Sequence, residues 1–309
     1  MTLSRCLLVL GFCGVGFCGI LSAQAVNYSY DAAGRLNGVT LPNGKVITYT
    51  YDAAGNLLRR IVATPAAGPA PVSSSAGVLN AASEQGSAVA PGEIVVIYGT
   101  GIGPAALANF QISPTQFFES YTGNTTVSFD GIPAPLIYSS SGQTAAIVPY
   151  ALAGKIQTQM VVTYQGNASA PVTLPVAASA PGLFSANGSG TGNGAISNQD
   201  GSVNSPSNPA ARGSVVVLYG TGEGQTTPSG VDGRIANAIY PKPVLPVKVS
   251  IGGVDATSGV LYAGAVPTLV AGVFQINVTV PTSVPAGAVP VVVTIGSASS
   301  QSGLTVSLK

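Results

Sequence analysis

The sequence contains no histidine and no tryptophan, and its three cysteines all fall near the N-terminus, at Cys6, Cys13 and Cys18. These absences exclude a Ser-His-Asp triad, a thiolate nucleophile and the usual zinc sites from the rest of the chain. They also leave no pair of thiols there for a disulfide, so the fold must be held together by burial alone. We therefore expect no cofactor and no metal site.

Charged residues are scarce as well, at 7% of the chain, and the formal net charge is +1. A near-neutral chain has no basic surplus with which to bind nucleic acid or an anionic membrane surface. The catalytic apparatus still available is a pair of carboxylates facing across a cleft, as in glycosidases. Nothing in the sequence brings two acids together, so we expect no enzyme, with a carboxylate-based glycosidase as a remote alternative. The acids are Asp31, Asp52, Glu84, Glu93, Glu119, Asp130, Asp200, Glu223, Asp232 and Asp255.

The N-terminal segment has a single basic residue, Arg5, before an apolar run from Cys6 to Leu21 that leads into Ala23-Gln24-Ala25. A basic start, an apolar stretch and an A-x-A end are typical of a secretory signal peptide, here residues 1–25. The run is shorter than the roughly 20 apolar residues that a spanning helix needs. The sequence thus predicts a protein that is secreted or held at the cell surface, with no membrane span in the mature chain.

Most of the remaining chain is an internal duplication of one β unit. IVVIYGTGIG at 94–103 returns as VVVLYGTGEG at 215–224, TTVSFDG at 125–131 as VKVSIGG at 247–253, and QTAAIVP at 143–149 as QINVTVP at 275–281. Short alternating strands between frequent turn residues favour a soluble β-sandwich. We predict a first sandwich at 77–177, a hinge at 178–185 and a second sandwich at 186–309, each with its own core. An Ala/Pro/Ser-rich linker at 62–76 precedes them.

Each copy opens with a glycine, an apolar strand and a Gly-x-Gly-x-Gly turn, a pattern that resembles the immunoglobulin-like IPT/TIG fold. The second half also resembles an uncharacterised C-terminal domain of secreted Solibacter proteins, on Ala180-Pro181-Gly182, the YGTGEG turn and the FQIN segment that begins at Phe274. These resemblances imply an all-β chain of tandem immunoglobulin-like β-sandwiches. They bring no assigned activity.

The glycine turns superficially look like nucleotide-binding turns, but Pro104 follows the first and no committed helix start follows either. Phosphate binding of that kind needs a helix N-terminus. We interpret these glycines as structural, because glycine admits positive φ where a strand turns sharply. If so, Gly222→Val should lower the melting transition of the second sandwich alone. The structural turn positions are Gly99, Gly101, Gly103, Gly220, Gly222 and Gly224.

A second, shorter repeat begins at Tyr28, where YSYDAAGRL is followed 21 residues later by YTYDAAGNL from Tyr49. Alternating tyrosines, an Asp-x-x-Gly turn and a returning leucine predict β-hairpins over residues 26–61. Both copies resemble the YD (Rhs) repeat. In that family many repeats coil into a large β shell, and some are linked to carbohydrate binding or toxin delivery.

Aromatic side chains supply the candidate ligand contacts. Two loops, 104–124 and 225–245, are inserted at the same place in both copies, and the first gathers several aromatics that either bind a ligand or cover the edge of their own sandwich. We predict a non-catalytic structural or adhesion protein that acts as a spacer or protein-binding scaffold, with a carbohydrate-binding module as the alternative. Its partner would be an extracellular protein or a glycan. The possible contacts are Tyr28, Tyr30, Tyr49, Tyr51, Phe117, Phe118 and Tyr121.

Overall fold

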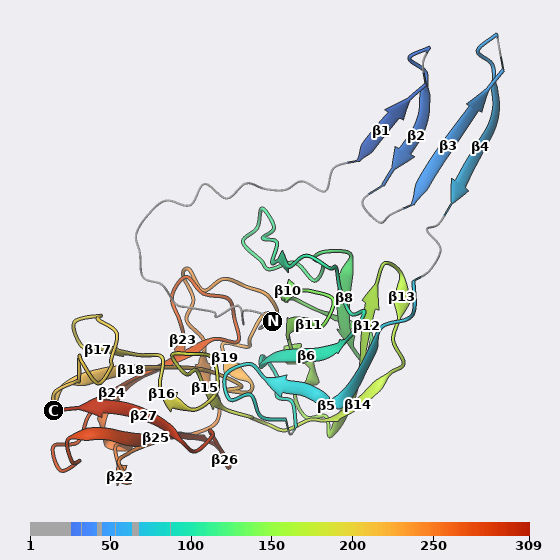
Figure 1. The fold of residues 1–309 in the computed structure, drawn as a ribbon. Helices are drawn as coiled ribbons and strands as arrows, with labels where there is room; N and C mark the ends of the chain where they lie inside the picture. The colour runs from blue at the N-terminus through green and yellow to red at the C-terminus, as the bar shows by residue number, and fades with distance from the viewer. Residues whose placement is uncertain (1–25, 32, 42–44, 53, 64–67, 87) are drawn as a thin grey trace.

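The computed structural model describes residues 26–309 apart from 32, 42–44, 53, 64–67 and 87. The predicted signal peptide, 1–25, lies outside these residues. Antiparallel strands dominate the described chain, and its helical elements are two 3₁₀ turns, η1 (Tyr150–Leu152) and η2 (Thr257–Gly259) (Figure 1). The predicted all-β fold class is therefore confirmed. Within the described ranges, no helix is long and apolar enough to cross a membrane.

The N-terminal sheet is a four-stranded antiparallel meander. In the first tyrosine repeat, Asp31 Oδ1 accepts hydrogen bonds from the backbone N–H groups of Ala33 at 3.0 Å and Arg35 at 2.9 Å. In the second, Asp52 Oδ1 accepts from Asn56 N–H at 2.8 Å. The aspartates thus close the two turns, as Asx turns do. The strands are β1 (Asn27–Tyr30), β2 (Leu36–Thr40), β3 (Val46–Tyr51) and β4 (Leu57–Ala63).

The first sandwich packs two five-stranded sheets around a core that includes Val95, Ile97, Val127 and Phe129, each at most 1% exposed. One sheet has the order β5 (Val72–Asn80), β6 (Ile94–Thr100), β11 (Gln143–Ile147), β10 (Leu136–Ser139), β7 (Ala108–Asn109). The other has the order β13 (Asn167–Ala168), β12 (Gln157–Tyr164), β8 (Thr125–Phe129), β9 (Ile132–Ala134), with β14 (Val172–Pro175) also paired to β12. Strand β5 begins at Val72, inside the segment predicted as a linker.

The second sandwich is built in the same way around Leu218, Ile276, Val291 and Val306. Its first sheet has the order β15 (Gly182–Leu183), β18 (Val215–Thr221), β24 (Phe274–Thr279), β23 (Val260–Ala265), with β17 (Ile196–Asn198) also on β18. The facing sheet has the order β16 (Gly192–Asn193), β27 (Leu304–Leu308), β25 (Gly287–Ile295), β21 (Val247–Ile251), β22 (Val254–Asp255), with β26 (Ala298–Ser299) on β25. A short ribbon pairs β19 (Thr226–Thr227) with β20 (Lys242–Pro243).

The duplication read from the sequence recurs in this topology. The strand order β6-β11-β10 of the first sandwich corresponds to β18-β24-β23 of the second, and β12-β8-β9 corresponds to β25-β21-β22. Even a buried hydrogen bond is repeated, because Ser169 Oγ accepts from Val162 N–H and Ser300 Oγ accepts from Val293 N–H, both at 3.1 Å.

A third hydrophobic cluster joins the two sandwiches. It combines Ile94, Val96 and Ile147 of the first with Tyr219 and Val273 of the second, among other side chains. Since Val95 and Ile97 face the first core, β6 is buried on both of its faces, which explains its uninterrupted apolar run. The backbone N–H of Ile94 also donates to Thr221 Oγ1 at 2.8 Å. Each sandwich has its own core. Because the shared cluster couples them, we now expect the two sandwiches to melt together, and the effect of Gly222→Val to reach both.

The two inserted loops meet at this interface. The backbone N–H of Phe118 donates to the carbonyl of Gly233 at 2.8 Å, and that of Ile235 donates to the carbonyl of Gln116 at 3.2 Å. Insertions at equivalent places in the two copies therefore pair with each other.

Candidate functional site

One face of the N-terminal sheet carries two of the four predicted tyrosines. Tyr28 is paired with Val39, Val39 with Ile47, and Ile47 with Val62, so these four side chains form a row across all four strands. Directly paired residues share a face, and so does Tyr49, two residues beyond Ile47. We call these five residues the tyrosine face. Tyr28 is 59% exposed and Val62 is 49% exposed.

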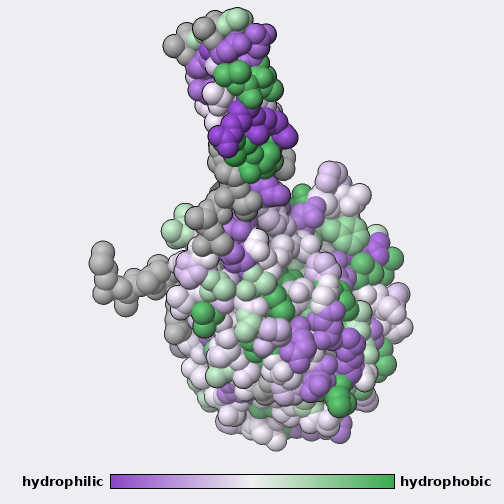
Figure 2. Space-filling model, turned by 90° about the vertical axis from the view of Figure 1, so that its right-hand side faces the viewer, coloured by the Kyte–Doolittle hydropathy of each residue, from purple (hydrophilic) through white to green (hydrophobic). Residues whose placement is uncertain are grey.

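The opposite face of the same sheet has a different character. Ser29, Gly38, Thr48 and Ile61 form the neighbouring cross-strand row, so three of its four positions are small or polar. For the described residues, no hydrogen bond and no buried cluster links this sheet to the sandwiches. Apolar and hydrophilic side chains lie next to one another on the projecting sheet in Figure 2. The row through Tyr28 is thus more apolar than the neighbouring row on the opposite face. Its exposed members are Tyr28 and Val62, whereas Val39 is buried.

The other two tyrosines lie nearby. Tyr30 is 61% exposed. The Tyr51 hydroxyl donates to the carbonyl of Leu36 at 2.8 Å, and the Arg35 guanidinium lies 4.9 Å from the centre of its ring. Arg35 also pairs with Asp31 at 2.8 Å. Tyr51 therefore helps to join the two repeats.

The predicted aromatic contacts of the first inserted loop are used internally. Phe118 packs against the shared cluster and stacks on Phe110 with ring centres 4.4 Å apart. Phe117 forms a β-bridge with Arg234 of the second loop, and the Tyr121 hydroxyl donates to the Asn124 side chain. Phe117 and Phe118 thus lie at the interface between the two copies, whereas Tyr121 bonds within its own loop. A role in ligand contact stays a prediction for all three.

The glycine turns are packed against neighbouring backbone in the second copy. Gly222 has φ +87°, and a Cβ there would overlap the carbonyl oxygen of Ala180. Gly101 has φ +66°, but a Cβ there would meet open space. A Cβ would also overlap neighbouring atoms at Gly99, Gly103, Gly220 and Gly224. Backbone geometry and packing alone account for these glycines.

Two buried glutamates stand out in a chain with so few charges. Glu93 is 1% exposed and fully bonded, because Oε1 accepts from Asn80 Nδ2 at 2.8 Å and Oε2 accepts from Ala90 N–H at 2.7 Å. Glu223 is 2% exposed, and its Oε2 has no hydrogen-bond partner. Burial of a carboxyl without a partner costs free energy. Glu223 is therefore the more unusual of the two.

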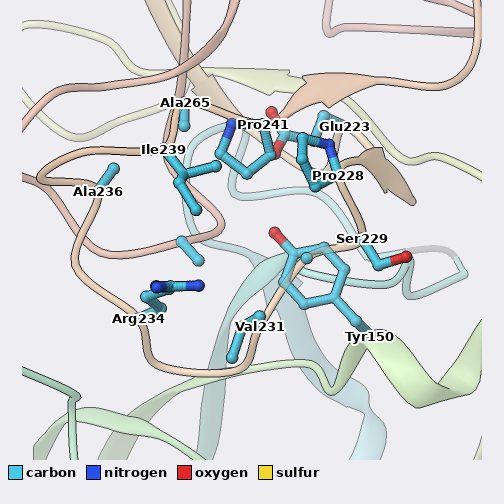
Figure 3. A pocket seen from close by; sticks show the side chains of 12 residues that line it. Tyr150, Glu223, Pro228, Ser229, Val231, Arg234, Ala236, Ile239, Pro241 and Ala265 are labelled. Atoms are coloured by element: carbon cyan, nitrogen blue, oxygen red, sulfur yellow. The ribbon is translucent and has the colours of Figure 1, made fainter.

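The Glu223 carboxyl opens into a pocket of about 50 Å³. Figure 3 shows the Tyr150 hydroxyl pointing toward the end of the pocket where Glu223 lies, while Arg234 reaches in from the side. Tyr150 comes from η1 of the first sandwich and lies with its ring against Gly92 and Gly230, where a Cβ would overlap it. The remaining walls are mostly apolar: Pro228, Val231, Ala236, Ile239, Pro241, Ala265 and Ala271.

Burial controls the electrostatics of this pocket. It raises the pKa of Glu223 to about 8. The pKa of Tyr150 lies well above its usual value, first through burial and then through the negative charges of Glu223 and Asp232. Burial also raises the pKa of Asp232, and the hydrogen bond from Tyr150 N–H, 2.8 Å long, partly opposes that rise. At neutral pH Glu223 therefore holds its proton.

Neither pocket with a buried glutamate has the ligand set of a resident metal site. Within the part of the chain that the structure describes, no three His, Cys, Asp or Glu side chains cluster in a way that could hold an ion. The Glu93 pocket, of about 230 Å³, is lined largely by polar groups such as Asn80, Ser179 and Gln301. Burial raises the pKa of Glu93 to about 8 as well.

Comparison with known proteins bears on the N-terminal sheet. Residues 30–68 match the RHS Repeat family model. That match covers β2, β3, β4 and the last residue of β1 in the N-terminal sheet, which we also call the RHS-repeat sheet, and not the sandwiches. It supports the predicted YD/Rhs repeats. No curated protein matches the chain.

Solved structures give only distant likenesses. The glycan-binding protein SGBP-B of the Bacteroides ovatus mixed-linkage glucan utilization locus, in complex with a heptasaccharide, is 12% identical, with 86% of this chain and 53% of that chain covered and a TM-score of 0.32. SGBP-B from a Bacteroides uniformis xyloglucan utilization locus is 13% identical, with 70% and 45% covered and a TM-score of 0.23. Domains 5-6 of the S-layer protein SbsC are 16% identical, with 77% and 98% covered and a TM-score of 0.22. The chain spans about half the length of the first of these.

The pocket residues were missed by the sequence analysis, although the repeat held a signal for one of them. Glu223 occupies the position that Ile102 takes in the first copy, and Ile102 is fully buried. An acid at a core position of a repeat is a mark of an unusual site. Tyr150 and Arg234 gave no such signal, because only the packing of the two copies brings them beside Glu223.

Proposed function

We propose that this chain is a non-catalytic, exported binding protein, in which two immunoglobulin-like sandwiches form a rigid scaffold and the tyrosine face of the RHS-repeat sheet contacts an extracellular protein. The observation that carries the proposal is the row Tyr28, Val39, Ile47 and Val62, which is apolar from edge to edge. Its outer members Tyr28 and Val62 are 59% and 49% exposed, while Val39 between them is buried. Large exposed apolar patches on soluble proteins mark interaction sites.

The chemistry of this face fits a protein partner. Tyrosine is enriched at protein interfaces, where its ring buries a large area and its hydroxyl keeps a hydrogen bond. Branched aliphatic side chains between the tyrosines extend the apolar surface. The shared cluster between the two sandwiches supports the scaffold role, since sandwiches packed through buried side chains do not rotate freely about a hinge.

Carbohydrate binding is the second candidate, and the exposed rings of Tyr28 and Tyr30 favour it. Such rings offer flat apolar faces to a sugar. A glycosidase is less well supported, because the residues that line the Glu223 pocket include no second carboxyl to face it across a cleft.

The test compares two variants of the mature protein. Tyr28→Asp places a charge on the tyrosine face, and Thr48→Asp places one on the opposite face of the same sheet. Immobilised parent and variants are exposed to extracellular proteins of the source cells and to a glycan array. We expect a protein that is retained by the parent and Thr48→Asp and lost with Tyr28→Asp. Retention of the same proteins by all three would rule out the tyrosine face, and a saturable glycan lost with Tyr28→Asp would establish the second candidate instead.

A further inference from the structure

The Glu223 pocket has a buried acid where the fold elsewhere places an aliphatic side chain. Glu223 replaces the fully buried Ile102 of the first copy, is itself 2% exposed, and has an oxygen with no partner. Glu93, by contrast, is bonded at both oxygens. A group that the protein's own chain leaves unsatisfied, at the end of an open pocket, is available to a ligand.

The ionisable groups around Glu223 include both acids and bases. The Asp232 carboxyl accepts a hydrogen bond from the backbone N–H of Tyr150. The negative charges of Glu223 and Asp232 both raise the pKa of the Tyr150 hydroxyl. Glu223 also acts on the hydroxyl of Tyr262. Arg234 lies at the wall with its side chain exposed to solvent. The ionisable groups on the surrounding elements are Tyr150, Asp232, Arg234, Tyr240, Lys242 and Tyr262.

We propose that the Glu223 pocket binds a small primary ammonium ion that carries a short apolar chain. The ammonium group supplies three N–H donors and a charge to the Glu223 carboxylate, with the Tyr150 hydroxyl as a further acceptor. The alkyl chain lies against Pro228, Val231 and Ile239 at the wall of the pocket. An anion has no N–H donor for the Glu223 carboxyl, and a neutral alcohol would supply one hydrogen bond without the charge.

Binding is coupled to a proton. The free protein holds Glu223 protonated at neutral pH, and the ammonium ion binds the ionised form, so the carboxyl O–H proton leaves to solvent as the ion pair forms. Affinity should therefore rise about tenfold per pH unit from pH 6 to pH 8 and then level off, since an alkylammonium keeps its own proton until roughly pH 10. A site without a titrating acid shows no such dependence.

The test is a titration of the mature protein, followed by amide NMR shifts, with n-butylammonium, n-butanol and butanoate as probes. At pH 8 we expect n-butylammonium to bind with a dissociation constant between about 0.1 and 10 mM, the range open to a ligand of this size. The alcohol should bind at least tenfold more weakly, and butanoate should not bind. Glu223→Gln should weaken n-butylammonium binding at least tenfold, and Val231→Trp should block the pocket from its exposed rim.

The control variant is Glu119→Gln, which removes an exposed acid outside the pocket and should bind like the parent. The proposal is overturned if n-butanol binds as tightly as n-butylammonium, if Glu223→Gln binds like the parent, if affinity is unchanged between pH 6 and pH 8, or if no saturable shift occurs. Val231→Trp changes only a surface residue, so it tests the pocket even where Glu223→Gln alters the fold.

Discussion

Replacing Glu223 with glutamine should change how the stability of the protein depends on pH. The pKa of Glu223 is about 8 in the folded state, against 4.5 for the ordinary side chain. Between these values the folded protein holds a proton that the unfolded chain has released. The contribution of this proton to the free energy of unfolding is therefore fully present below pH 4.5, and it is lost as the pH rises through about 8.

The magnitude follows from this proton difference. Within that window each such carboxyl lowers the free energy of unfolding by up to about 1.4 kcal/mol per pH unit, or roughly 3 kcal/mol between pH 5 and pH 7. Glu93 contributes in the same direction and by a similar amount, since burial also raises its pKa to about 8. Glu223→Gln should remove about half of the combined decline. Asp232, whose pKa is raised too, adds a further decline to both proteins.

The assay is urea unfolding at 25 °C and pH 5, 6 and 7, with free energies taken from linear extrapolation. This range avoids the aspartates whose pKa values are lowered, such as Asp31 and Asp130, because they titrate at lower pH. We expect the free energy of unfolding of the parent to fall at each pH step. That of Glu223→Gln should fall less, so the difference between the two proteins should shift in favour of the variant as the pH rises. Parallel curves for the two proteins, or a parent whose stability rises over this range, would refute the reasoning.

Three more predictions concern the scaffold. Gly222→Val should lower the free energy of unfolding by about 1–3 kcal/mol, because valine there has a strained φ and its Cβ overlaps the Ala180 carbonyl. Gly101→Val should lower it less, because its Cβ meets open space, and chemical denaturation measures both. Ile147→Ala in the shared cluster should cost about 2–5 kcal/mol and lower the melting of both sandwiches together in calorimetry, so a loss confined to one sandwich would contradict the shared cluster. Asp31→Ala should speed amide hydrogen exchange in the first turn and leave the sandwiches unchanged, because its carboxylate bonds only within that turn.

The strand plan could be predicted from the sequence because both kinds of repeat leave periodic marks. The alternation of Phe274, Ile276 and Val278 with polar residues predicted a half-buried strand, and β24 has that burial. The uninterrupted run from Ile94 to Ile97 has no such alternation, because this strand is buried on both faces. Its second face meets the other sandwich, and contacts between copies leave no local pattern.

The candidate sites divide along the same line. Period-two spacing predicted the tyrosines Tyr28 and Tyr49 on one face, whereas Val39, Ile47 and Val62 join them only through the pairing of the four strands. The Glu223 pocket depends on Tyr150, which lies 73 residues earlier in the chain by the printed numbering and arrives only through packing of the two sandwiches. Comparison of the two copies position by position marks Glu223 but not its neighbours.

Site-specific photo-crosslinking on β1 tests the central claim most directly. A photoreactive phenylalanine analogue replaces Tyr28 on the tyrosine face in one protein and Ser29 on the opposite face in another, and both are illuminated in the extracellular medium of the source cells. The account predicts a discrete protein adduct from position 28 and none from position 29. Equal adducts from both positions, or none from position 28, would contradict it.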